Sequence, residues 1–225
     1  MPVTLHHAHP WDLTPSEAIA VQKQLAPLVR EERLDLDSLT TVGGLDVSVR
    51  EDRVRAAAVV IRLADMETVD EAIWEAPVAF PYVPGLLSFR EVPALLPALE
   101  QLRAMPDAWM LDAQGRAHPR RFGLACHLGV LLDCPALGVA KTLLVGRYAN
   151  LEEEKGSTVD LVHRGEVVGR AVRTREKVNP VFVSVGHRIT LDDAVALALR
   201  LTGKTKLPEP TRRAHNLSYR GQPGA

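Results

Sequence analysis

Three acidic residues stand where a carboxylate is expected to do chemistry. Asp46 lies inside the apolar run TVGGLDVSV, Asp112 ends the run AWMLD, and Glu91 closes the segment YVPGLLSFRE. A carboxylate in a strand-like run is costly to bury unless it is paired or binds a metal. Three oxygen donors of this kind favour a hard divalent cation such as Mg²⁺ or Mn²⁺. The sequence therefore predicts metal-assisted chemistry, with phosphate as the expected substrate group.

The overall composition is that of a globular protein without a strong net charge. Of the 225 residues, 46% are apolar and 24% are charged, and the formal net charge is −1. We expect a single domain over residues 1–225. This charge balance argues mildly against a bulk electrostatic nucleic-acid binder, yet it allows a local basic face. Three basic groups are candidates for that face, each with an ordinary solvated surface as the alternative: Arg116, His118, Arg120 and Arg121; Arg170, Arg173, Arg175 and Lys177; and Lys204, Lys206, Arg212 and Arg213.

Membrane spans and secretion signals are not expected. No apolar stretch is long enough to cross a bilayer, and the first residues lack the basic and apolar regions of a secretory signal. The two cysteines, Cys126 and Cys134, make no disulfide framework. The three histidines among the first ten residues are expected to lie in a disordered terminus. We therefore expect a cytoplasmic monomer without a membrane partner.

The segment from Thr14 to Glu32 is predicted to form the first helix. Thr14 suits the N-cap, Pro15 suits the first helical position, and Glu17 completes a capping box. Pro27 lies inside this pattern and is expected to kink or divide the helix. Further helices are predicted from Val92 to Ala104, starting at Glu91, from Arg120 to Leu132, and from Thr190, as N-cap, to Leu201.

Apolar and β-branched runs predict the strands, and short polar connections at 50–53 and 164–165 predict hairpins. The tail from Gly203 is rich in proline and basic residues and is expected to pack as an extended segment. The order of elements predicts an α/β fold, with one mixed sheet that joins an antiparallel meander to a parallel βαβ portion and is flanked by helices. The predicted strands are Thr41–Val49, Val54–Leu63, Thr68–Ala79, Ala108–Asp112, Ala136–Ala140, the hairpin Thr158–Val172, and Val181–Val185.

Six sequence patterns follow one another along the chain. They are GLDVSV around Asp46, PYVPGLLSFRE up to Glu91, LDAQGRAHPRRFGLACHLG, GVAKTLLVG, NPVFVSVGHRI and PEPTRRAHNLS. Together they closely resemble the Endonuclease V family, from about Thr41 to Ser218. The resemblance implies a ribonuclease H-like fold. It also implies a DNA repair nuclease that depends on Mg²⁺, for which Mn²⁺ is expected to substitute.

The resemblance implies an activity at deaminated purines. Such an enzyme recognises deoxyinosine and hydrolyses the second phosphodiester bond on its 3′ side, which leaves a 3′-hydroxyl and a 5′-phosphate. Residue by residue, it implies that Asp46 and Asp112 hold the metal and that Glu91 either holds it with them or orients the attacking water. Lys141 and His215 are expected to act with these three residues in catalysis. A lysine is needed there because its charge stabilises a phosphate or the negative charge that develops in the transition state.

Reading a deaminated base requires the base to leave the helical stack. The resemblance makes Tyr82 the wedge that fills the resulting gap, on a loop stiffened by flanking prolines. Backbone groups of the segment 85–88 are expected to hold the flipped base in a tight pocket. The residues expected to bind the substrate are Tyr82, Pro84, Gly85, Leu86, Gly115, His118 and Gly138.

Two other functions stay open at this level. The same site would serve an endoribonuclease that acts mainly on inosine-containing RNA, and a contact with a 2′-hydroxyl would separate the two. Alternatively, the chain is a sensor of deaminated nucleic acid that does not cut. The set of Asp46, Glu91, Asp112 and Lys141 speaks against a sensor, because binding alone does not need all of them.

Overall fold

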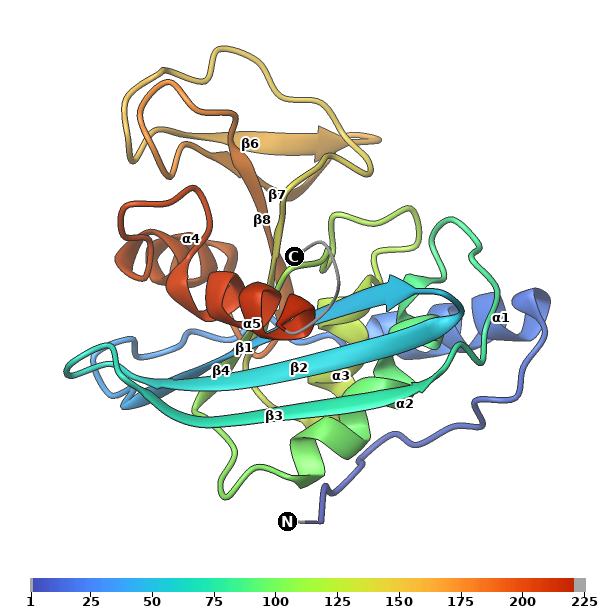
Figure 1. Ribbon diagram of the computed structural model, residues 1–225. Coiled ribbons are helices and arrows are strands. Elements are labelled where there is room, and N and C mark those ends of the chain that lie inside the picture. Colours follow the sequence, from blue (N-terminus) through green and yellow to red (C-terminus); the bar gives the residue numbers. More distant parts are fainter. Residues whose placement is uncertain (1, 221–225) are drawn as a thin grey trace.

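An eight-stranded mixed sheet runs through the computed structural model, which describes residues 2–220 (Figure 1). Its strand order is β3-β2-β1-β4-β5-β8-β7-β6. The central strands β1, β4 and β5 pair in parallel, and the strands on both sides of them pair antiparallel. The predicted mixed sheet is therefore confirmed. The strands are β1 Thr41–Arg50, β2 Arg53–Arg62, β3 Thr68–Pro77, β4 Ala108–Leu111, β5 Ala136–Ala140, β6 Thr158–His163, β7 Glu166–Val172 and β8 Val181–His187.

Helices cover both faces of the sheet because its strands are apolar on both sides. In β2, Ala56 and Ala58 belong to the core under α2 and α3, whereas Ala57 and Val59 pack with residues of α5. This alternation is the period of two expected of a strand. Helix α4 lies on the same face as α5 (Figure 1). The helices are α1 Pro15–Leu25, α2 Leu87–Glu100, α3 Leu124–Leu132, α4 Leu191–Arg200 and α5 Glu209–Tyr219, with a 3₁₀ turn at Ala26–Leu28.

The N-caps of α1 and α4 and the hairpin turns were predicted correctly. The Thr14 side chain accepts from the backbone of Glu17, whose carboxylate in turn accepts from the Thr14 N–H, which forms the capping box. Thr190 caps α4 in the same position. The hairpin turn between β1 and β2 places Glu51 at φ 48° and Asp52 at φ 60°, the left-handed pair that matches the twist of hairpin strands.

Four predicted helix boundaries are wrong, one of them the end of α2, which lies at Glu100 rather than Ala104. The first helix ends at Leu25 rather than Glu32, since Pro27 cannot donate the next helical hydrogen bond. Helix α2 begins at Leu87, so Glu91 lies one turn inside it. Helix α3 begins only at Leu124, because the preceding residues form a turn in which Arg121 has φ 58°.

The tail after Gly203 was predicted to be extended, but it contains the helix α5. Pro210 stands in the first turn of this helix, where its missing N–H has no intrahelical acceptor to lose. Ala214 and Leu217 recur at a spacing of three and pack on β2. A narrow apolar stripe in a polar sequence was enough to form a helix once a sheet face was available to bury it.

The N-terminal segment packs against the protein instead of forming the predicted disordered terminus. Val3, Leu5 and Trp11 pack on the core beneath α2 and α3, and the ring of His9 lies 4.4 Å from that of Trp11. Their apolar and ring surfaces explain why this segment is ordered. Among residues 2–220, no helix is long and apolar enough to cross a membrane.

Candidate active site

The parallel register brings two acidic residues together where the pairing of β1 with β4 ends, in the middle of β1 and just after β4. Leu45 of β1 pairs with Leu111 of β4, so Asp46 and Asp112 directly follow a matched pair. The Asp112 N–H donates to the Leu45 carbonyl oxygen over 3.2 Å and holds this alignment. The carboxyl ends of parallel strands are where open α/β sheets usually bind ligands.

Helix α5 completes the environment of Asp46. His215 Nδ1 lies 3.2 Å from Asp46 Oδ2, and the Ser218 hydroxyl donates to the same oxygen over 2.7 Å. The two residues stand three positions apart and therefore share a helix face. The helix can lie this close because a glycine faces it: a Cβ on Gly44 would fall 1.9 Å from the Pro210 carbonyl oxygen.

Lys141 supplies positive charge to the cluster from the end of β5. Its Nζ lies 2.5 Å from Asp112 Oδ2 and 3.4 Å from His215 Nδ1. Burial raises the pKa of Asp112, and the hydrogen bond and charge of Lys141 oppose that rise. The side chain of Asp112 is 7% exposed and that of Lys141 37%, so the ammonium group can also reach a ligand from solvent.

Glu91 reaches the cluster from α2, on the opposite face of the sheet. It is buried and lines a small cavity together with Asp46 and Asp112. Burial, and after it the charge of Asp46, raise the pKa of Glu91 well above its usual value. The charge of Arg90 opposes this rise, and the charge of Asp112 adds to it. Like charges crowded in a buried place favour either a bound proton or a bound cation.

The donor set fits a divalent cation. One ligand atom from each of Asp46, Asp112 and His215 lies within 4.8 Å of the others. Carboxylate donors suit Mg²⁺ or Mn²⁺, which need only one or two of them beside water. The structure thus gathers His215 with the two aspartates, and Glu91 lies beside them in the cavity wall.

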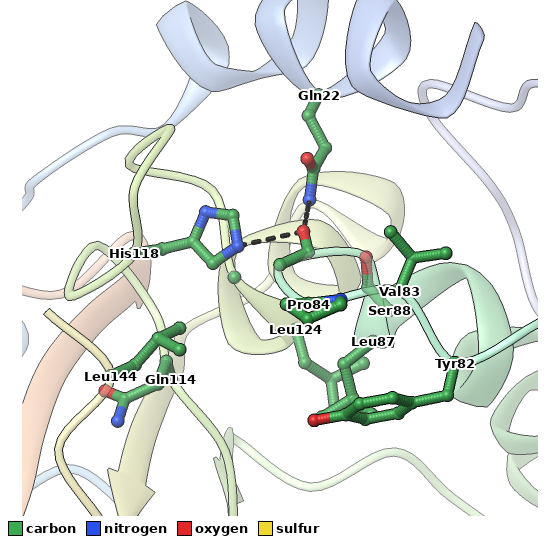
Figure 2. A pocket seen from close by; sticks show the side chains of 12 residues that line it. Gln22, Tyr82, Val83, Pro84, Leu87, Ser88, Gln114, His118, Leu124 and Leu144 are labelled. Atoms are coloured by element: carbon green, nitrogen blue, oxygen red, sulfur yellow. Dashed lines mark hydrogen bonds between the residues drawn. The ribbon is translucent and has the colours of Figure 1, made fainter. Parts of the chain in front are cut away.

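A second cavity adjoins the acidic cluster. It has a volume of about 160 Å³, and the two cavities share Leu87 and Leu124 as walls. Tyr82 stands at this cavity with 71% of its surface exposed (Figure 2). The remaining lining residues are Gln22, Val83, Pro84, Gly85, Ser88, Gln114, His118, Gly123 and Leu144.

The carbonyl oxygen of Gly85 is held by three donors from distant parts of the chain. Gln22 Nε2 donates to it over 2.9 Å, His118 Nε2 over 3.0 Å and Arg120 Nη2 over 2.6 Å, the first two of which Figure 2 shows. Gly85 has φ +78°, a conformation that favours glycine. These contacts fix the loop that carries Tyr82.

His118 therefore acts on the loop and is not a free acid or base. Its Nδ1 accepts from the Arg120 N–H over 3.2 Å, so both ring nitrogens are used. Burial first, and the charge of Arg120 second, lower the pKa of His118 to about 4. At neutral pH the ring is uncharged and carries its proton on Nε2, as the contact with Gly85 requires.

Three of the residues expected at the substrate do not line this cavity. Leu86 is buried in an apolar cluster with Phe80 and Phe89. A Cβ on Gly115 would fall 2.0 Å from the Val185 carbonyl oxygen, and one on Gly138 would meet the backbone of Ala113 at 2.4 Å. Both glycines allow close packing of backbone beneath the site.

Sequence reasoning missed several residues that line the cavities or contact the acidic cluster. Gln22 occupies the buried face of α1 beside Ala18 and Leu25, and a glutamine at that spacing was a usable signal. Ser218 stands one turn after His215 in the last pattern, but the tail was not expected to be helical. Leu144 gave no local signal, because only the fold brings its loop to the pocket.

The strand order and the acidic cluster at the parallel strand ends are those of a nuclease with a ribonuclease H-like fold. The family model described as Endonuclease V matches residues 23–216. This chain belongs to the Endonuclease V family, and it is an endonuclease.

Individual relatives agree with this assignment. The chain is 52% identical over 216 residues to Endonuclease V of Gloeobacter violaceus, and the matched region covers 93% of this chain and 87% of that protein. The crystal structure of Endonuclease V from Streptomyces avermitilis superposes with a TM-score of 0.90 at 45% identity, over 98% of this chain and 97% of the other. Endonuclease V of Ciona intestinalis has a TM-score of 0.79 at 28% identity, over 90% of this chain and 95% of the other, and was solved with a 24-mer DNA containing an inosine followed by a ribo-adenosine.

Proposed function

We propose that this endonuclease recognises deoxyinosine in DNA and hydrolyses the second phosphodiester bond on its 3′ side, as a step of DNA repair. The products would be a 3′-hydroxyl and a 5′-phosphate. One observation carries the proposal: the cavity beside Tyr82 and the acidic cavity share Leu87 and Leu124 as walls. A base held in the first cavity would therefore place its neighbouring backbone near the carboxylates.

The inosine-containing DNA bound by the Ciona intestinalis relative supports the same substrate class. Tyr82 is an exposed ring on a loop held by three hydrogen bonds, which suits it to fill the gap left by a flipped base. The largely apolar cavity behind it suits a planar base, since a stacked base gains apolar contact on both faces.

We propose Mg²⁺ as the cation, with Mn²⁺ as a substitute. Asp46, Asp112 and His215 would hold it, and Glu91 would orient a water beside them. When bound, the cation supplies Lewis acidity toward a phosphate oxygen and a water. Lys141 would place its ammonium group against the charge on the phosphate.

Inosine-containing RNA is the second candidate substrate. The oligonucleotide bound by the Ciona intestinalis relative carries a ribose directly after the inosine. A site that accepts that ribose would accept an RNA strand at the same position. A monomeric state and a cytoplasmic location stay predictions from the sequence, to be checked by light scattering and by cell fractionation.

The proposal is tested with labelled duplexes that carry one deoxyinosine or one adenine at the same position, beside the matched inosine RNA. Each is incubated with Mg²⁺ or with EDTA. A Mg²⁺-dependent cut one nucleotide beyond the inosine, on its 3′ side, supports the proposal. The ratio of the DNA and RNA rates chooses between the two substrates. Equal rates on inosine and adenine duplexes would reject it.

A further inference from the structure

A chain of hydrogen-bonded side chains connects the N-terminal segment to the cavity beside Tyr82. His9 Nδ1 lies 2.7 Å from the Pro10 carbonyl oxygen, and His9 Nε2 lies 2.7 Å from His127 Nε2. His127 Nδ1 in turn lies 2.9 Å from the hydroxyl of Ser88. Ser88 is 2% exposed and lines the cavity (Figure 2).

The direction of every hydrogen bond in this chain follows from its first member. A carbonyl oxygen only accepts, so His9 carries its proton on Nδ1 and a neutral ring leaves Nε2 bare. His127 must then donate from Nε2, which leaves its Nδ1 as an acceptor. The only proton left to donate to that nitrogen is the hydroxyl proton of Ser88.

The surroundings keep both rings neutral. His127 is fully buried among the rings of Trp11, Phe89 and Phe122. Burial lowers the pKa of His127 well below its usual value, and proximity to His9 lowers it further. Burial also lowers the pKa of His9, although its bond to Pro10 opposes the change. While both rings stay neutral, Ser88 donates to His127 and His127 donates to His9.

We propose that Ser88 is a specificity-determining residue of the base cavity, fixed by His127 and His9 as a hydrogen-bond acceptor that selects purines with a proton on N1. This rests on the proposed function, because the cavity must hold a flipped base. Hypoxanthine carries a proton on N1, whereas adenine has a bare lone pair there. The Watson–Crick edge, freed by flipping, is the edge that such a site reads.

Ser88 would discriminate between hypoxanthine and adenine because adenine leaves the serine oxygen without a hydrogen-bond donor. Facing Ser88, adenine would oppose two lone pairs and leave a buried oxygen without a donor. A site built to bond one polar group rejects an analogue that lacks it, and one hydrogen bond corresponds to about a 10-fold difference in affinity. His9 and His127 are positioning residues here, since neither lines the cavity.

The test measures binding in EDTA, so that cleavage does not interfere, to duplexes with inosine, adenine or nebularine, a purine with a bare N1 and no 6-substituent. Ser88→Ala is expected to weaken inosine binding about 10-fold and to leave nebularine binding within about 2-fold. His127→Phe keeps a ring in place but frees the Ser88 hydroxyl to rotate. It is expected to reduce the inosine-to-adenine ratio mainly by improving adenine binding.

Thr202→Val is the matched control. It also removes a buried hydroxyl, which donates to the Ala198 carbonyl at the end of α4 and lines neither cavity. It should keep the wild-type ratios. Thermal unfolding of each variant separates lost binding from lost folding.

The outcomes separate the inference from the function on which it rests. If folded Ser88→Ala keeps the wild-type inosine-to-adenine ratio, or loses inosine and nebularine affinity equally, Ser88 does not read N1. If wild-type protein itself binds inosine and adenine equally, the proposed function fails instead. If the serine variant does not fold, a retained wild-type ratio in His127→Phe overturns the proposed polarity.

Discussion

Asp112 is a residue at which the proposed metal binding and the stability of the fold have opposite requirements. It is buried next to Asp46, and burial raises its pKa, so the folded protein holds a charge in an unfavourable place. Lys141 compensates only in part, because it is also exposed to solvent. Binding sites often retain such groups at the expense of stability.

Asp112→Asn keeps the shape of the side chain and removes the charge. Cleavage should fall more than about 100-fold, because loss of a residue that only hydrogen-bonds a metal ligand already costs up to about 100-fold. The melting temperature in EDTA should stay equal or rise, because the repulsion with Asp46 is gone. A variant that cleaves at the wild-type rate would show that this carboxylate holds no metal.

Tyr82 makes few contacts in the free protein, so its contribution is expected only when nucleic acid is bound. Its exposed ring should stack at the lesion, and base–ring stacking is worth about 1–3 kcal/mol. Tyr82→Ala should weaken binding to an inosine duplex about 10-fold or more, while the stabilisation of the protein by Mg²⁺ stays unchanged. Trp74→Ala, which removes another partly exposed ring, on β3, is the control. Unchanged lesion affinity in Tyr82→Ala would rule out the wedge.

At the level of secondary-structure elements, α5 decides whether the acidic cluster is complete. It brings His215 and Ser218 to Asp46, and it rests on β1 at a place where only a glycine fits. Helix α1 plays a comparable part on the other side of the site, since Gln22 holds the Gly85 carbonyl.

The contact between α5 and β1 leaves no room for a side chain at Gly44. In Gly44→Ala the new Cβ would collide with the Pro210 carbonyl, which is backbone and cannot move alone, so α5 should shift away from β1. Cleavage should fall at least about 10-fold and the melting temperature by several degrees, as for a loss of about 1–3 kcal/mol from overpacking. Gly203→Ala is the control, since its Cβ would meet only Glu209 Oε1 at 3.7 Å. A Gly44→Ala protein with unchanged activity and stability would show that α5 tolerates displacement.

The whole molecule buries several histidines in uncharged form. Burial lowers the pKa of His9, His118, His127 and His187. Each ring binds a proton more readily in the unfolded chain, where its pKa is near 6.5. The unfolded state therefore takes up more protons as the pH falls, and this part of the stability, fully present above about pH 6.5, is lost below it.

His118 makes this effect measurable, because its pKa falls from 6.5 to about 4. Between pH 7.5 and 4.5 it should account for about 2–3 kcal/mol of the decrease in the free energy of unfolding. In urea unfolding, His118→Gln should show a smaller decrease than the wild type by that amount. His7→Gln, at an exposed histidine, should decrease like the wild type. If the free energy of unfolding decreases equally with pH in the wild type and in His118→Gln, the fold does not hold His118 neutral.

Local signals in the sequence predicted those parts of the molecule that depend on neighbours along the chain. Thr14 and Thr190 cap their helices, and the hairpin turns lie where polar pairs interrupt apolar runs. These features follow from hydrogen bonds and side-chain periods that span only a few residues.

Tertiary structure alone decided the contacts between distant segments. The Gly85 carbonyl meets donors up to 63 residues away, and His9 meets His127 across 118 residues. The tail became a helix because a sheet face was there to bury Ala214 and Leu217. Propensity and period do not encode such contacts, since they form only when packing has brought the surfaces together. Sequence patterns singled out Asp46, Glu91 and Asp112, which lie together at one small cavity, whereas the fold placed the polar side chains around them and shaped the cavity beside them.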